Sequence, residues 1–256
     1  SQGLDWGTGP GLRDFGRGSR AGVRTSGVMT VRLVASKVDY RYPGSAEWVV
    51  GDWSHGFGAG QVCAVTGPSG CGKSTRLYLL GLMVRPSGGQ VLLDGERVDH
   101  LRDGQRSRLR ASRFGFVFQD AVLDSTRTVL DNVLEAALYR GQDGKELTGR
   151  ARALLEEMGV SVPVTRRPGQ ISGGQAQRIA MCRALVGRPD VVIADEPTGN
   201  LDPDSATAVL GMLRAQAQQG ACVVVVTHDP VVRNWADVAV EVGALPALAG
   251  GWRGKS

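Results

Sequence analysis

Short apolar runs of strand length alternate along this chain with segments of helical character, and this alternation restricts the possible folds more than any other feature. The clearest runs are Val62–Thr66, Val191–Asp195 and Ala221–Thr227. They are almost continuously apolar, which is typical of strands buried on both faces of a parallel sheet. We therefore expect an α/β fold with a mainly parallel core sheet.

The remaining elements follow the same alternation. Further strands are expected at Val91–Asp94 and Phe114–Phe118. Helices are expected to end near residue 83 and to cover about residues 128–140, 146–158, 174–186 and 204–219. Residues 1–28 are rich in glycine without a strand or helix period, which predicts a flexible extension before one domain over residues 29–256.

The composition excludes several classes of protein. The 256 residues are 42% hydrophobic and 21% charged, which excludes wholesale disorder, and no apolar stretch reaches the roughly 18–20 residues of a transmembrane helix. The net charge is +5, but the basic residues are dispersed among acids, so no nucleic-acid partner is expected. The four cysteines form no C-x-x-C pair, which predicts free thiols in a reducing compartment.

The segment after the first of these buried runs has the pattern of a phosphate-binding loop. Residues 67–75 read Gly-Pro-Ser-Gly-Cys-Gly-Lys-Ser-Thr and fit G-x-x-x-x-G-K-[ST] between a strand and a helix. Glycines let backbone N–H groups turn toward phosphates, and the helix N-terminus favours anions. Lys73 is expected to reach the β- and γ-phosphates, and Ser74 to hold Mg²⁺. The predicted nucleotide site comprises Gly67, Pro68, Ser69, Gly70, Cys71, Gly72, Lys73, Ser74 and Thr75.

A pair of acids follows the apolar run at residues 191–194. Asp195 and Glu196 stand where a buried strand ends, and open α/β sheets bind their ligands at the carboxyl ends of strands. Asp195 is therefore expected to bind Mg²⁺ through water. Glu196 is expected to polarise a water that attacks the γ-phosphate.

Several further motifs together resemble those of the ATP-binding-cassette (ABC) ATPases. They are Ile171-Ser-Gly-Gly-Gln175, Ala194-Asp-Glu-Pro-Thr-Gly-Asn-Leu-Asp202, Phe116-Val-Phe-Gln119, His228 after a Val-rich strand, and Tyr42 in Tyr-Pro-Gly. They occur in that family's order over about residues 31–240. The resemblance implies a P-loop NTPase cassette in which the parallel core carries an antiparallel β edge subdomain and an inserted α-helical subdomain at about residues 120–188.

The resemblance also implies a role for each motif. Gln119 would contact Mg²⁺ and the attacking water, and His228 would hold the γ-phosphate. Ser172, Gly173, Gly174 and Gln175 would contact the γ-phosphate bound by an opposite subunit, and Asp202 would shape the dimer contact. Tyr42 would stack on adenine, although Tyr40 could take this place instead. The catalytic set is then Glu196, His228, Gln119 and Lys73, and the metal set is Ser74, Gln119 and Asp195.

The implied function is an ATP-binding and ATP-hydrolysing subunit of an ABC transporter. Two copies of the chain would close on ATP and Mg²⁺ and would power a separate membrane permease, from a position on the cytoplasmic face of the membrane. The amino-acid sequences of these motifs are similar to those of one subgroup, the ATPases of lipoprotein release, macrolide or peptide export, and cell division. The alternative is a soluble ABC ATPase acting on nucleic acid or the ribosome. A single cassette without a long heptad insertion makes it the less favoured alternative.

The chain also departs from the pattern of the family. Ile171 stands where the signature motif of the family usually has leucine. Asp124 stands near a position at which many relatives carry proline. The segment Trp48–Phe57 deviates from the usual apolar strand of the family, so the sequence does not define the edge of the first sheet or the platform for adenine. No catalytic group is lost, so we expect an active ATPase.

Overall fold

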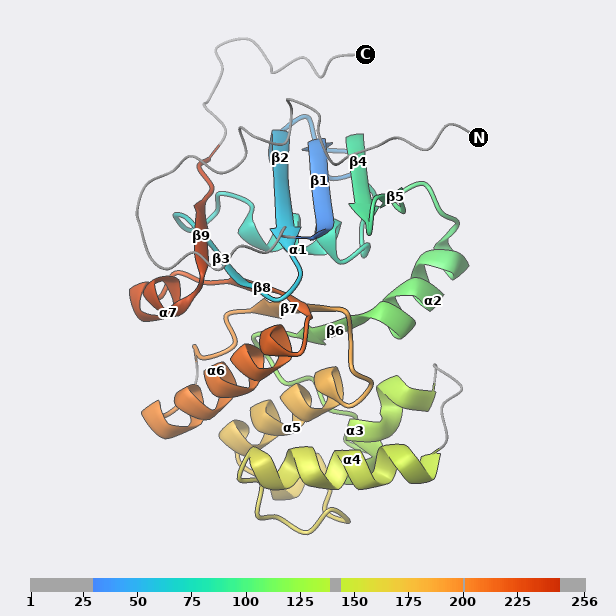
Figure 1. The fold of residues 1–256 in the computed structure, drawn as a ribbon, viewed down its shortest axis with the longest axis vertical. Helices are drawn as coiled ribbons and strands as arrows, with labels where there is room; N and C mark the ends of the chain where they lie inside the picture. The colour runs from blue at the N-terminus through green and yellow to red at the C-terminus, as the bar shows by residue number, and fades with distance from the viewer. Residues whose placement is uncertain (1–29, 139–143, 200, 245–256) are drawn as a thin grey trace.

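The computed structural model describes residues 30–138, 144–199 and 201–244, which form two sheets and a layer of helices. An antiparallel sheet lies at the top of the view, a parallel sheet lies in the middle, and helices cover the bottom (Figure 1). The predicted α/β fold with a mainly parallel core is confirmed. The predicted extension over residues 1–28 lies outside the described residues.

The parallel sheet brings the predicted site motifs to one edge. Its strands, in the order β6-β7-β8-β3-β9, are Phe114–Val117, Val191–Asp195, Cys222–Val226, Val62–Thr66 and Val238–Glu241. All neighbouring pairs run parallel, and every residue of β3, β7 and β8 is buried. Parallel pairing places the carboxyl ends of these strands at the same edge. The loops that follow β3, β7 and β8 are therefore neighbours.

The antiparallel sheet shows which segment forms the sheet edge that the sequence does not define: it is β2 (Val50–Gly58). Its strands, in the order β2-β1-β4-β5, are Val50–Gly58, Val31–Tyr40, Gly88–Leu93 and Glu96–Arg97. The atypical segment forms β2 and turns Val50, Trp53 and Phe57 into the core. The implied antiparallel β subdomain is thus present, with a tryptophan in its buried face.

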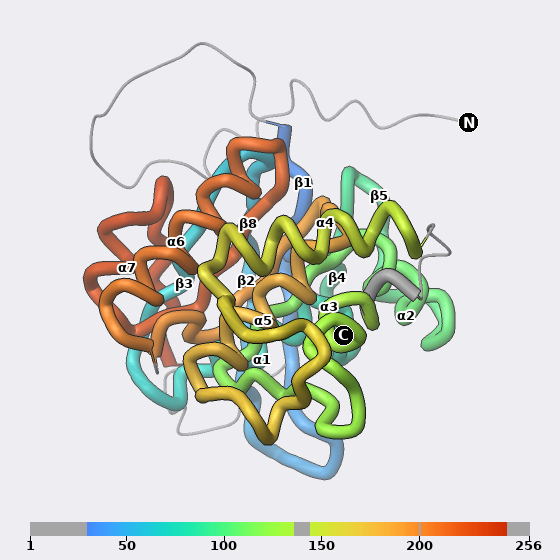
Figure 2. The backbone as a smooth tube through the Cα atoms, turned by 90° about the horizontal axis from the view of Figure 1, so that it is seen from below, coloured from blue at the N-terminus to red at the C-terminus, as the bar shows by residue number. Residues whose placement is uncertain are grey.

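One helix lies between the two sheets and the others cover the remaining faces. They are α1 (Lys73–Leu80), α2 (Asp103–Arg113), α3 (Val129–Leu138), α4 (Gly144–Glu157), α5 (Gly173–Leu185), α6 (Pro203–Gln218) and α7 (Pro230–Trp235). Helix α1 contacts β1 as well as β7 and β8. Helices α3, α4 and α5 pack on one another, and Figure 2 shows α4 crossing the underside of the molecule. These three helices fall within the implied helical subdomain, whose bounds stay a prediction.

The sequence prediction omitted α2, α7 and β9 because these elements lack a clear apolar period. In α2 the buried residue is Arg106, not an aliphatic side chain. Arg106 and Arg110 both donate to the carbonyl of Leu82 beyond the end of α1, at 3.3 and 2.7 Å. Arginine stems packed in this way, together with the partly buried Leu109, anchor a helix whose sequence is mostly polar.

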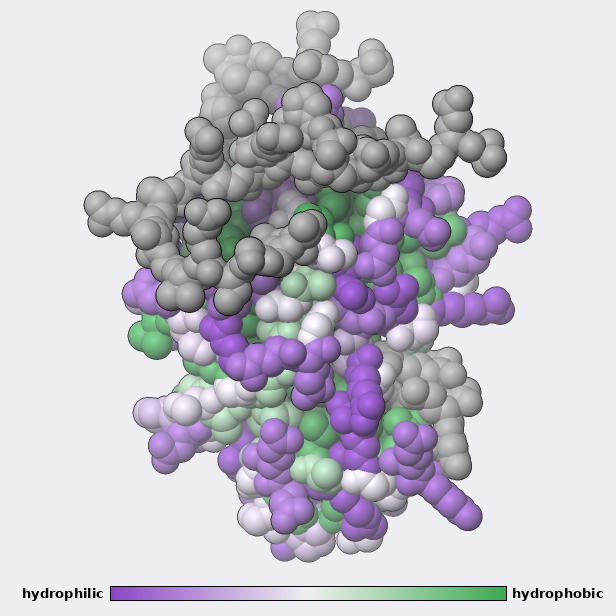
Figure 3. Space-filling view, in the orientation of Figure 1, coloured by the Kyte–Doolittle hydropathy of each residue, from purple (hydrophilic) through white to green (hydrophobic). Residues whose placement is uncertain are grey.

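Polar side chains cover much of the visible surface. On the face in Figure 3, hydrophilic residues are interspersed with smaller hydrophobic areas over the helical layer. Within the part of the chain that the structure describes, no helix has the length and apolar character needed to cross a membrane.

The close packing of β6 on α5 yields a stability prediction. A Cβ on Gly115 would lie 2.4 Å from the carbonyl oxygen of Ala184. We expect Gly115→Ala to lower the free energy of unfolding by about 2 kcal/mol, because the backbone of α5 must move away. Urea unfolding measures this change.

The control is Gly211→Ala on the exposed side of α6, where a Cβ would meet nothing within 4 Å. This change should raise the free energy of unfolding by roughly 0.5–1 kcal/mol through helix propensity. Equal stability of Gly115→Ala and the parent would contradict the tight contact between β6 and α5.

Candidate nucleotide-binding site

The predicted phosphate loop joins β3 to α1 in the form that the sequence predicts. Gly67, Gly70 and Gly72 have positive φ angles of 154°, 79° and 82°. A Cβ on Gly67 would lie 2.1 Å from the carbonyl oxygen of Val242, so a side chain does not fit there. All nine predicted residues from Gly67 to Thr75 follow one another from the end of β3 into the first turn of α1.

Lys73 folds back over this loop. Its Nζ donates to the carbonyl oxygens of Gly67 at 2.8 Å and Pro68 at 3.0 Å. The ammonium therefore lies beside the open backbone of the loop. A cation in that place, together with the amides of a helix N-terminus, attracts phosphate oxygens.

Asp195 at the end of β7 is buried close to the loop. It is 9% exposed. Burial, followed by repulsion from Glu196, raises its pKa, while a hydrogen bond from Ser74 and the charge of Lys73 act in the opposite direction. The structure thus brings Ser74 and Asp195 together as the sequence predicts. A hydroxyl and a carboxylate at a phosphate site suit Mg²⁺, which binds few protein ligands and shares substrate phosphates.

Glu196 is held by the segment that follows β8. Thr227 Oγ1 donates to Glu196 Oε2 at 3.1 Å, and the backbone N–H of His228 donates to Glu196 Oε1 at 3.1 Å. His228 Nδ1 lies 2.6 Å from the same Oε1 atom. Glu196 has a φ of 45°, a conformation uncommon for a glutamate, and its N–H bonds the carbonyl of Val226. Backbone and side chain together fix this carboxylate at the sheet edge.

Sequence reasoning did not single out Thr227, which is fully buried. Its hydroxyl donates to Glu196 and accepts from the N–H of Asp229 at 3.0 Å. The only hint in the sequence is its place between a strand of valines and a histidine. A threonine there reads equally well as the last residue of the strand.

Gln119 lies two residues beyond the end of β6 and its side chain is exposed. Strand β6 pairs with β7, and Val117 lies opposite Ala194, so Gln119 is close along the sheet edge to Asp195. The neighbouring Phe118 carbonyl accepts a bond from Gln177 Nε2 at 2.9 Å. The structure thus anchors the backbone before Gln119 on α5.

Ser172 to Gln175 form the start of α5. Ser172 Oγ accepts from the N–H of Gln175 at 3.2 Å, and Gln175 Oε1 accepts from the N–H of Ser172 at 2.9 Å. This is a capping box, and it leaves Ser172 and Gly173 exposed with Gly174 beside them. Among the described residues, no hydrogen bond or ion pair joins this turn to the phosphate loop of the same chain.

Asp202 caps α6. Its carboxylate accepts from the N–H of Ser205 at 2.9 Å and from the hydroxyl of Ser205 at 2.6 Å. These bonds lower the pKa of Asp202. The side chain thus has a structural role within this chain, and its part in a dimer contact stays a prediction.

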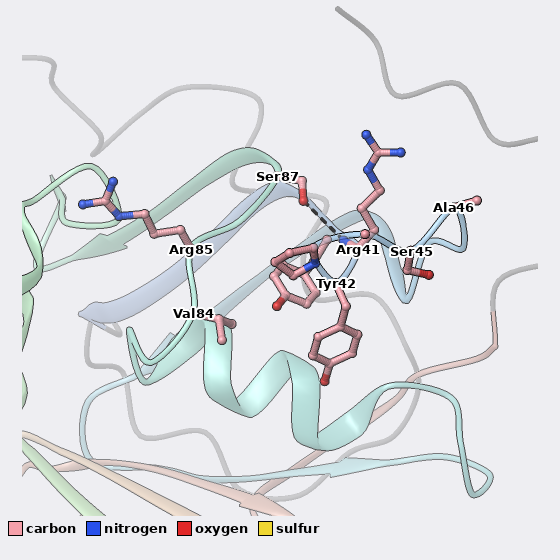
Figure 4. Close-up of a pocket in the computed structure, with 10 residues that line it drawn as sticks. Arg41, Tyr42, Ser45, Ala46, Val84, Arg85 and Ser87 are labelled. Atoms are coloured by element: carbon pink, nitrogen blue, oxygen red, sulfur yellow. Dashed lines mark hydrogen bonds between the residues drawn. The ribbon is translucent and has the colours of Figure 1, made fainter.

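The two candidate aromatic residues differ in exposure. Tyr40 is 5% exposed, whereas Tyr42 is 46% exposed. Their rings meet edge to face at 5.1 Å, and the Tyr42 hydroxyl lies 3.1 Å from Thr75 Oγ1. Tyr42 lines a cleft of about 770 Å³. Figure 4 shows its ring directed toward α1, with Arg41 and Arg85 pointing outward. Of the two rings, Tyr42 is the one with a face available to a base.

Comparisons with known proteins agree on one family. The family model described as ABC transporter matches residues 50–199. The chain is 46% identical over 186 residues to the macrolide export ATP-binding/permease protein MacB 1/2 of Paracoccus denitrificans, which covers 73% of this chain and 28% of that relative. It is 44% identical over 175 residues to the lipoprotein-releasing system ATP-binding protein LolD 1 of Caulobacter vibrioides, which covers 68% of this chain and 75% of that relative. The chain therefore spans little more than a quarter of the length of its macrolide-export relatives.

Solved structures give the same result for the fold. A dimeric structure of a bacterial ABC transporter cassette, MJ0796, has a TM-score of 0.76 and 30% identity, with 82% of this chain and 94% of that chain covered. A post-hydrolysis dimer of the same cassette, bound to ADP and phosphate, also has a TM-score of 0.76, at 28% identity, with 87% of this chain and 100% of that chain covered.

The buried charge of Asp195 predicts a pH-dependent effect on stability. Because its pKa is raised in the folded state, its ionisation opposes folding at neutral pH. We expect Asp195→Asn to raise the melting temperature of the nucleotide-free, Mg²⁺-free protein at pH 7.5 by a few degrees. This gain should shrink as the pH falls through the raised pKa and vanish below the ordinary aspartate value of about 3.9.

Differential scanning calorimetry from pH 7.5 down to the lowest pH at which the protein still unfolds reversibly measures this dependence. The exposed Asp120→Asn serves as the control and should leave the melting temperature unchanged. A lower melting temperature for Asp195→Asn at pH 7.5 would show that the Asp195 carboxylate stabilises the fold.

Proposed function

The chain belongs to the ABC transporter family of ATP-binding domains, and from this premise we propose that it hydrolyses ATP to power a membrane permease. The observation that carries the proposal is the convergence at one sheet edge of the phosphate loop, the Ser74–Asp195 pair and the fixed carboxylate of Glu196. Each of these features serves phosphoryl transfer, which depends chiefly on positioning and charge stabilisation.

The residues present fit Mg²⁺ and the triphosphate. Gly67, Gly70 and Gly72 have positive φ angles, and glycines in such conformations let backbone N–H groups turn toward phosphates. Lys73 would bind the β- and γ-phosphates, and Ser74, Asp195 and Gln119 would hold Mg²⁺, Asp195 through water. When bound, Mg²⁺ neutralises charge on the phosphates. Among the described residues no group of three or more acids, histidines or cysteines could hold a metal, so substrate oxygens would complete the coordination.

Glu196 is the proposed general base. Hydrogen bonds from Thr227 and from the backbone of His228 hold its carboxylate, while His228 itself remains largely exposed. A fixed carboxylate next to the phosphate loop is placed to accept the proton of an attacking water. His228, on the same oxygen, would orient that carboxylate and contact the γ-phosphate.

A second copy of the chain would complete each site. Ser172 and Gly173 are exposed at the N-terminus of α5 and offer a hydroxyl and backbone N–H groups. Gly174 and Gln175 belong to the same turn. This turn would contact the γ-phosphate held by the other copy, with Asp202 at the contact between copies. The dimeric state of a cassette at 30% identity supports this arrangement.

Closure of two copies on ATP would move the permease. We propose a place for the domain on the cytoplasmic face of the membrane, with helices of about residues 120–188 transmitting the motion. Both curated relatives named above are parts of export or release systems, which supports export or extraction as the direction. Tyr42, rather than Tyr40, would stack on adenine, since its ring is exposed beside Thr75.

The experiment that tests this proposal replaces the base. We expect Glu196→Gln to lower the turnover of Mg²⁺-ATP by at least about 100-fold, because a carboxamide does not accept the proton. Mg²⁺-ATP should still bind, and the bound variant should elute as a dimer in size-exclusion chromatography. Phosphate release measures turnover.

Glu156→Gln on the exposed face of α4 is the matched control and should hydrolyse ATP as the parent does. Undiminished turnover in Glu196→Gln would remove Glu196 from its proposed role. Absence of Mg²⁺-ATP binding by the parent would contradict the proposed function itself.

A further inference from the structure

A buried arginine lies directly behind the phosphate loop. Arg76 occupies the first turn of α1, is 4% exposed and forms no ion pair with any acid in the described residues. Its Nε atom is buried without a hydrogen-bond partner. Burial lowers the pKa of the guanidinium, yet arginine stays charged at neutral pH because its ordinary pKa exceeds about 12. An unpaired buried charge is costly, so it calls for an explanation.

The guanidinium is bonded to the loop itself. Arg76 Nη1 donates to the carbonyl oxygen of Cys71 at 2.6 Å. The peptide between Cys71 and Gly72 is trans and planar, so its C=O and N–H groups point in opposite directions. Holding the carbonyl toward Arg76 therefore turns the N–H of Gly72 away from the protein interior. That N–H belongs to the N-cap residue of α1, where phosphate-binding amides are found.

Trp53 and Gly72 pack against the guanidinium of Arg76 and exclude water from it. Its central carbon lies 5.5 Å from the centre of the Trp53 ring on β2. A Cβ on Gly72 would lie 3.1 Å from Arg76 Nη1 and 2.9 Å from Val49 Cγ1, so only glycine leaves room for this packing. A cation over an aromatic face is stabilised without a counter-charge. Because water is excluded, its charge is screened less than that of a surface arginine.

We propose that Arg76 is a positioning residue of the phosphate cradle, which fixes the Cys71–Gly72 peptide and supplies a second positive charge behind the loop. The inference rests on the proposed nucleotide site. Lys73 acts from the open side of the loop, whereas Arg76 acts from the buried side. The anion that compensates the buried guanidinium is then the phosphate group of the bound nucleotide.

Substitutions at Arg76 separate its hydrogen bond from its charge. Arg76→Met removes both, Arg76→Lys keeps the charge, and Arg76→Gln keeps a neutral donor. We expect Arg76→Met to bind Mg²⁺-ADP and Mg²⁺-ATP about tenfold more weakly, the scale of one charge-assisted hydrogen bond. Arg76→Lys and Arg76→Gln should each recover part of this loss. Isothermal titration calorimetry measures binding without relying on turnover.

Stability distinguishes this role from a structural one. Removing a buried charge that has no ion-pair partner relieves its desolvation cost, which opposes the loss of the bond to Cys71 and of the Trp53 contact, so the melting temperature of the nucleotide-free protein should change little. A lower melting temperature together with unchanged affinity in all three variants would assign Arg76 to folding alone and overturn the proposal.

Arg106→Met is the matched control. Arg106 is also buried and also has an unpartnered Nε, but it is paired with Asp103 at 2.9 Å and donates to Leu82 beyond the far end of α1. The affinity of the Arg106→Met variant for Mg²⁺-ADP and Mg²⁺-ATP should equal that of the parent. Equal affinity of Arg76→Met and the parent would overturn the role of Arg76 while leaving the proposed function intact. A parent that does not bind Mg²⁺-ATP would instead refute the nucleotide site on which the inference rests.

Discussion

The parallel hydrogen bonding of β3, β8 and β7 is the constraint on which the rest of this structure depends. Registered pairing places Val65 opposite Val226, and Val226 opposite Asp195, so the three strands end level with one another. Residues separated by more than 150 positions in the chain become neighbours through backbone bonds alone. The loop after β3, the acid after β7 and the histidine after β8 then meet without any contact between their side chains being needed to bring them together.

The same edge concentrates charge where water is scarce, and this has a cost in stability. Burial and the charge of Glu196 oppose the ionisation of Asp195 and raise its pKa, while Ser74 and Lys73 offset part of that cost. Glu196 takes an uncommon backbone conformation, and two donors from the β8 side, Thr227 Oγ1 and the N–H of His228, reach its carboxylate beside the His228 ring. Both features oppose folding locally and prepare a cluster of groups for a charged ligand. The fully buried strands β3, β7 and β8 supply the stability that offsets this local cost.

What could be predicted from the sequence follows from the same physics. Buried strands such as β3 and β7 are continuous apolar runs, so their positions were predicted to within a residue. Helix α2 was missed because its anchor is the stem of Arg106, which a polar pattern hides. Which tyrosine is exposed depends on tertiary packing, and the sequence left Tyr40 and Tyr42 as alternatives. The hydrogen bond of Thr227 to Glu196 joins two separate strands, so no local pattern could indicate it.

One departure from the family pattern is explained by a buried charge next to it. The segment around Trp53 departs from the usual apolar strand of the family, and Arg76 places a charge in the buried face of α1. In the folded chain each accounts for the other, because the ring of Trp53 covers the guanidinium of Arg76. A tryptophan at that place without a cation would lose this contact, and the arginine without the ring would lose its aromatic neighbour. The two residues therefore form one structural unit, and this unit touches the phosphate loop through the carbonyl of Cys71.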